Sequence, residues 1–79
     1  MKIYCILLKA TKTMRIVKTL IIIGDKIVNI SKELADWGIG EYNPKYDALT
    51  IKPYGLNSIN YIKEELFKKL GKEISIFWV

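Results

Sequence analysis

The sequence lacks histidine and has a single cysteine, Cys5, among its 79 residues. Histidine is the commonest general base, so its absence excludes Ser–His–Asp triads and Cys–His dyads within one chain. A structural zinc site needs four nitrogen or sulfur ligands, which one thiol cannot supply, and an internal disulfide is excluded for the same reason. We expect no metal and no cofactor. We expect Cys5 in the core, on one face with Ile3 and Leu7, because free cysteines are usually buried.

Long apolar runs are also missing. The run that follows Lys2 ends at Lys9, and the run 20–23 is closed by Asp25. Both are far shorter than the roughly 20 residues that span a bilayer, and no small-residue cleavage site follows the first. We therefore expect no membrane segment or export signal, and a cytoplasmic setting in which the thiol stays reduced.

What the chain has in abundance is aliphatic side chains, since 51% of its residues are hydrophobic. We expect one domain, 1–79, that buries only about 60–65% of the surface of its unfolded chain. A core of this size supplies little more than about 3–5 kcal/mol. With disulfide and zinc excluded, stability must come from a dense core or from burial against a second copy, which favours a homo-oligomer, most simply a dimer.

Residues 2–9 and 14–23 are rich in β-branched side chains, which favour strands, and 11–13 forms a turn between them. A competing interpretation is a long helix, because apolar residues recur at alternating spacings of four and three. The members of this stripe are Ile16, Leu20, Ile23, Ile27, Ile30, Leu34 and Trp37. Gly24-Asp25 interrupts it with a turn signal, so we predict a strand, a turn, and then a helix over 25–37.

The second half carries clearer signals. Gly38 is placed to end the first helix, and Asn43-Pro44 predicts a turn before the alternating segment 48–52, which together indicate a β-hairpin. The apolar spacing in 57–70, followed by Gly71, predicts a second helix. The last segment, 73–79, predicts a strand, and its apolar composition favours the centre of the sheet over an edge.

These elements predict an α+β fold in two layers. The sheet would have about 4–5 strands, mostly antiparallel, with the helices 25–37 and 57–70 on one face. If 14–23 were helical instead, the order would be the ferredoxin-like βαββαβ, with a long first helix.

Charge is distributed unevenly along the chain. The formal net charge is +5, and the first acid is Asp25. A hairpin of 2–9 and 14–23 would gather four basic side chains at and beside its tip: Lys9, Lys12, Arg15 and Lys18. Such a cluster suits nucleic-acid phosphates, an acidic protein surface or an anionic ligand. The alternative is that lysines keep an exposed sheet from pairing edge to edge.

Two further groups of residues are candidates. Aromatic side chains could form a partner interface, and those placed for it are Tyr42, Tyr46, Phe77 and Trp78. Three carboxylates lie near one another in sequence, Asp36, Glu41 and Asp47, and could in principle form a hydrolytic pair or hold Mg²⁺. Acids beside a turn and a helix end are ordinarily solvated, and we favour that interpretation.

The sequence therefore favours a small non-enzymatic binding or regulatory module that acts through its surface on a protein or on nucleic acid. Its lysine- and isoleucine-rich composition is common in small proteins of viruses and mobile elements. The alternatives are an obligate homo-oligomeric structural or assembly protein and a small carboxylate-dependent enzyme.

Overall fold

The computed structural model describes residues 3–13, 15–52 and 57–79. Within these ranges the chain forms six strands and two helices. In chain order they are β1 (Cys5–Ala10), β2 (Ile16–Ile23), β3 (Lys26–Asn29), α1 (Ser31–Asp36), β4 (Glu41–Asn43), β5 (Ala48–Thr50), α2 (Asn57–Leu70) and β6 (Ser75–Trp78).

Strand β2 is the hub of a single mixed sheet. One edge of β2 pairs with β1, and the other edge pairs with β5 near Ile16 and with β3 from Leu20 onward, all antiparallel. Strand β4 flanks β5, and β6 lies parallel to β1 at the opposite side of the sheet. The predicted α+β class and the mostly antiparallel sheet are confirmed, although the sheet has six strands rather than four or five.

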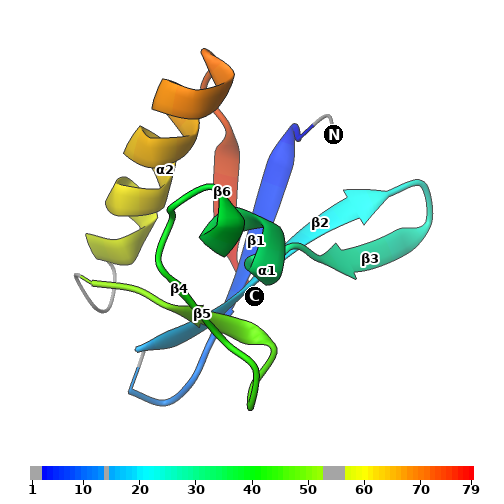
Figure 1. Cartoon of the computed structure of the whole chain (residues 1–79). Coiled ribbons are helices and arrows are strands. Elements are labelled where there is room, and N and C mark those ends of the chain that lie inside the picture. The colour runs from blue at the N-terminus through cyan, green and yellow to red at the C-terminus, as the bar shows by residue number, and fades with distance from the viewer. Residues whose placement is uncertain (1–2, 14, 53–56) are drawn as a thin grey trace.

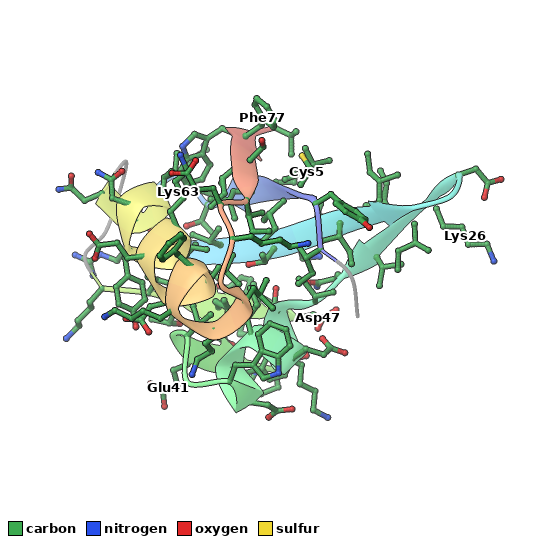
Figure 2. All side chains as sticks on the ribbon, turned by 90° about the horizontal axis from the view of Figure 1, so that it is seen from above. Cys5, Lys26, Glu41, Asp47, Lys63 and Phe77 are labelled. Atoms are coloured by element: carbon green, nitrogen blue, oxygen red, sulfur yellow. The ribbon has the colours of Figure 1, made fainter. Side chains whose placement is uncertain are left out.

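Both helices contribute to one core against one face of this sheet. Alternate residues of β1 and β2 are buried there, among them Ile6, Leu8 and Val17, in one cluster with Leu34 of α1 and Leu66 of α2. Figure 2 shows the two helices on one side of the sheet, with Cys5 and Phe77 on the other. The two-layer arrangement predicted from the sequence is thus present, and no described helix covers the other face of the sheet.

The helix predicted over 57–70 is confirmed as α2. Its buried residues Ile62 and Leu66 lie one turn apart, and the helix ends where the N–H of Gly71 donates to the carbonyl of Phe67 at 2.9 Å. Gly71 has a φ of +72°, the left-handed conformation typical of a residue that terminates a helix. Neither helix in the described ranges has the length and apolar character needed to cross a membrane.

The helix predicted over 25–37 is wrong in its first half. The chain turns at Gly24-Asp25 but returns as β3, and only Ser31–Asp36 is helical. Strand β3 satisfies its backbone by pairing with the end of β2, with Ile27 opposite Ile22. Ile30 and Leu34 of the predicted stripe are buried, whereas Ile27 is 64% exposed, so the stripe combined residues from a strand and a helix. The ferredoxin-like alternative fails as well, because 16–23 is a strand.

Two other expectations are corrected. Strand β6 lies at an edge of the sheet rather than at its centre; its apolar composition reflects Ile76 and Trp78, which pack on the core next to β1. Cys5 is half-buried and lies on the uncovered face, because β1 directs the alternate residues Ile6 and Leu8 toward the helices. Ile3 is buried as expected.

Candidate functional site

The predicted β1–β2 hairpin places two like charges opposite each other. Lys9 and Lys18 are paired residues of the antiparallel ladder, and both side chains are exposed. Directly paired residues point to the same side of a sheet, here the uncovered side, which we call the open face. Like charges at such positions destabilise a sheet. Lys12 lies exposed in the connecting turn and Arg15 is exposed just before β2.

A third lysine reaches this place from another part of the chain. Beside the lysine pair is a shallow cavity of about 390 Å³, and its lining includes Lys9, Lys18, Lys45, Tyr46 and Ile16. Lys45 and Tyr46 belong to the turn between β4 and β5, and the pairing of β5 with β2 brings this turn alongside the β1–β2 hairpin. We call Lys9, Lys18, Lys45 and Tyr46 the basic depression.

The basic depression combines positive charge with an aromatic face. The Nζ of Lys45 lies 5.3 Å from the ring centroid of Tyr46, and this ring is 43% exposed. A cation at that distance from a ring face is attracted by its quadrupole. An incoming ligand can therefore meet the ammonium group and the ring together.

No described carboxylate lies within ion-pair distance of the three lysines of the basic depression; Glu65 and Lys68, 3.6 Å apart on α2, form an ion pair elsewhere. The positive charge of the depression is thus not neutralised by a neighbouring acid. Such a surface attracts anions and accelerates their arrival.

Tyr42, predicted as an interface residue, is half-buried and stabilises the β4–β5 hairpin that carries Lys45. Its hydroxyl donates to the Asp47 carboxylate at 2.5 Å, and the side-chain oxygen of Asn43 accepts the N–H of Lys45 at 3.0 Å. The bond to Asp47 raises the pKa of the Tyr42 phenol, and desolvation and the charges of Asp47 and Glu33 raise it further. These bonds fix the turn that positions Lys45 and Tyr46.

Phe77 and Trp78, the other predicted interface residues, point in opposite directions. Phe77 is 56% exposed on the open face beside Leu7, whereas Trp78 packs on the core. The indole N–H of Trp78 is buried and has no hydrogen-bond partner among the described residues. Of this pair only Phe77 is available to a partner.

The carboxylates Asp36, Glu41 and Asp47 are each exposed and lie on α1, on β4 and in the β4–β5 turn. In the described part of the chain, no three or more Cys, Asp or Glu side chains are grouped so that they could hold a metal ion. The fold thus gathers lysines rather than acids around the cavity of the basic depression.

Of the residues predicted from the sequence, Lys9, Lys18 and Tyr46 line the basic depression, whereas Lys12 and Arg15 do not; Lys45 was not among the predicted residues. The turn that carries Lys45 was predicted, but nothing in the local sequence says which strand its hairpin joins. In comparisons with known proteins, no family model, curated protein or solved structure matches this chain. Its function is therefore argued from its own residues.

Proposed function

We propose that this protein is a non-enzymatic binding module that takes up single-stranded nucleic acid at the basic depression. The observation that carries the proposal is the pairing of Lys9 with Lys18 across β1 and β2. Two ammonium groups held side by side repel each other, and no described acid relieves this repulsion. A phosphate group placed between them would turn the repulsion into two attractions.

The neighbouring aromatic ring favours nucleic acid over other anions. Proteins that bind single strands combine a basic groove, which follows the phosphates, with aromatic side chains on which bases stack. Tyr46 lies next to the lysine pair, and the cavity of about 390 Å³ is within the range of small-ligand sites. The chain has one arginine, the residue most used to read base edges in a duplex, so we expect weak sequence preference.

The test is binding of fluorescein-labelled 12-nucleotide single strands of DNA and RNA, followed by anisotropy from low to physiological salt. Each neutralised phosphate contributes a slope of about −0.7 to log K against log salt, so three lysines predict a slope of roughly −2. The variant K9Q/K18Q should bind about tenfold or more weakly and show a shallower slope. Tyr46→Leu should weaken binding about fivefold or more, through lost stacking, and leave the slope unchanged.

The matched control is K32Q/K69Q, which removes the same charge from exposed helical positions on α1 and α2. An equal loss of affinity in both double variants would mean that only net charge matters, and the proposed site would be wrong. Absence of binding at low salt would overturn the function itself. If polyglutamate displaces the oligonucleotide as well as an unlabelled strand does, the partner is an acidic protein surface instead.

A further inference from the structure

The far end of the sheet carries exposed aliphatic side chains. Strands β2 and β3 form a hairpin that extends away from both helices (Figure 1). On the open face of this hairpin Ile22 is paired with Ile27, and the two side chains are 59% and 64% exposed. Solvent-exposed positions of a hairpin are usually occupied by polar residues. The exposure of two paired isoleucines therefore indicates a surface that a partner covers.

These isoleucines continue into the middle of the sheet. Leu7 is paired with Leu20 on one side and with Phe77 on the other, so the three side chains form one row across β6, β1 and β2. The next row contains Cys5, which is paired with Ser75, and it leads toward Ile22 and Ile27. The apolar patch is defined as Cys5, Leu7, Leu20, Ile22, Ile27 and Phe77. It contains no charged residue.

We propose that the apolar patch is the contact surface of a homodimer, in which two copies pack open face to open face. Ile22, Ile27 and Phe77 are each more than half exposed, and a side chain of this kind offers about 100 Å². Together with the half-buried members, each copy would contribute about 500 Å², or about 1,000 Å² in total, close to the lower end of specific interfaces. A patch of about 500 Å² is comparable to the largest apolar patch of a typical monomeric protein, and patches of that size are often functional surfaces.

The charges that border the patch fit a second copy. The Lys9–Lys18 row closes one end of the patch, and the β2–β3 turn with Asp25 closes the other; Lys26, which follows Asp25, is paired with Ile23 and points to the opposite face of the hairpin. A two-fold axis that lies in the interface and crosses the strands brings Lys18 level with the partner's Asp25. An axis along the strands would instead stack the two lysine rows on each other, and like charges would oppose it. The first arrangement is therefore the dimer that the structure favours.

This arrangement places the partner's Asp25 beside Lys18 of the basic depression, whereas Lys45 and Tyr46 lie in the β4–β5 turn, outside the apolar patch. Within one chain Lys18 and Asp25 are too far apart to interact, because the strand from Lys18 to Ile23, which separates Lys18 from the turn, corresponds to about 17 Å. Any energetic coupling between these two residues must consequently act between copies. The dimer does not rest on nucleic-acid binding, and each can fail without the other.

The first experiment measures mass by sedimentation equilibrium at micromolar concentrations. We expect the wild type to be a dimer of the 9.2 kDa chain, and Ile22→Glu to be a monomer, because an unpaired carboxylate would be buried in the contact. The matched control is Ile23→Glu: this neighbour is 52% exposed but points to the opposite face of the hairpin, so the dimer should persist. Phe77→Lys, on a different strand, should also give a monomer. Circular dichroism establishes that each variant is folded.

The second experiment is a charge exchange. Asp25→Lys and Lys18→Asp should each weaken the dimer severalfold, and the double variant D25K/K18D should recover most of the loss. A wild type that is monomeric at about 100 μM would overturn the proposal. Equal effects of Ile22→Glu and Ile23→Glu, or two single losses that add in the double variant, would also overturn the proposed face and orientation.

Discussion

The backbone N–H of Thr19 donates to the Oγ of Ser31 at 3.0 Å, which joins the middle of β2 to the first residue of α1. Both residues are buried. Ser31 Oγ donates in turn to the side-chain oxygen of Asn29 at 2.6 Å, and the Ser31 N–H donates to the same oxygen at 3.0 Å. The carbonyl of Thr19 accepts the N–H of Ile30 at 2.8 Å. These bonds fix the point at which β3 ends and the chain becomes helical.

Replacing Ser31 by alanine should therefore destabilise the fold. The buried N–H of Thr19 would lose its acceptor, at a cost of about 1–3 kcal/mol in the free energy of unfolding. Urea denaturation followed by tryptophan fluorescence measures the change. Ser75→Ala, at an exposed position, is the control and should stay within about 0.5 kcal/mol of the wild type. A Ser31→Ala variant as stable as the control would show that water replaces the serine oxygen.

Lys9→Glu should stabilise the sheet while it weakens nucleic-acid binding. A glutamate opposite Lys18 replaces a repulsive cross-strand pair by an attractive one, worth roughly 0.2–1 kcal/mol. The gain in unfolding free energy should shrink as salt rises, because the pair is exposed and screened. Denaturation and anisotropy on the same samples test both halves. If Lys9→Glu loses affinity and stability together, the lysine pair has a structural role instead.

The hydrogen bond between Tyr42 and Asp47 predicts an alkaline dependence of stability. The pKa of the Tyr42 phenol is raised above its ordinary value of 10.0 chiefly because the protonated hydroxyl donates a hydrogen bond to the Asp47 carboxylate. The hydrogen bond of the protonated phenol therefore stabilises the folded state fully below pH 10. This contribution is lost as the pH rises through the pKa that the phenol has in the folded state. The stability difference between wild type and Tyr42→Phe should therefore shrink above pH 10, as measured by urea denaturation at pH 8 and near pH 11.

The matching variant is Asp47→Asn, which keeps the residue's left-handed backbone, since Asp47 has a φ of +51° and asparagine tolerates that region. The phenol of Tyr42 should then ionise at lower pH in an ultraviolet titration. An unchanged titration in Asp47→Asn would mean that the hydrogen bond does not control the phenol.

Gly40 should resist substitution more than Gly24 does. Both have positive φ, +70° and +62°, so alanine at either position is strained by about 1–2 kcal/mol. At Gly40 a Cβ would also lie 3.1 Å from the carbonyl oxygen of Thr50 and 3.1 Å from a side-chain carbon of Ile51, whereas nothing lies within 4 Å at Gly24. Thermal denaturation should show Gly40→Ala to be the less stable variant. Equal melting temperatures would indicate that β5 shifts to make room.

The elements best predicted from the sequence are those whose signals are local. Helix α2 was found with its bounds because Ile62 and Leu66 repeat at helical spacing and Gly71 ends the pattern. Strand β2 was found because β-branched residues fill it. Strand β3 was missed because it lacks the alternation of apolar and polar residues that identifies a strand. Its adjacent apolar residues, Ile27 and Val28, lie on opposite faces and are both exposed.

The candidate site also contains features that depend on local sequence and features that depend on long-range packing. The pairing of Lys9 with Lys18 follows from a hairpin whose turn is readable in the sequence. The contribution of Lys45 depends on β5 joining β2, and the exposure of Ile22 depends on how far β2 extends beyond the helices. Both features follow from packing between distant segments, so no short stretch of the sequence predicts them.

The parallel pairing of β1 with β6 has a consequence for how the chain reaches this fold. It pairs Cys5 with Ser75 and Leu8 with Trp78, so it closes a loop that contains most of the chain. Contacts between such distant positions form late, because the chain loses the entropy of loop closure before these contacts can stabilise the fold. During synthesis β1 therefore leaves the ribosome with one edge exposed, and that edge stays open to a passing chain or chaperone until β6 emerges.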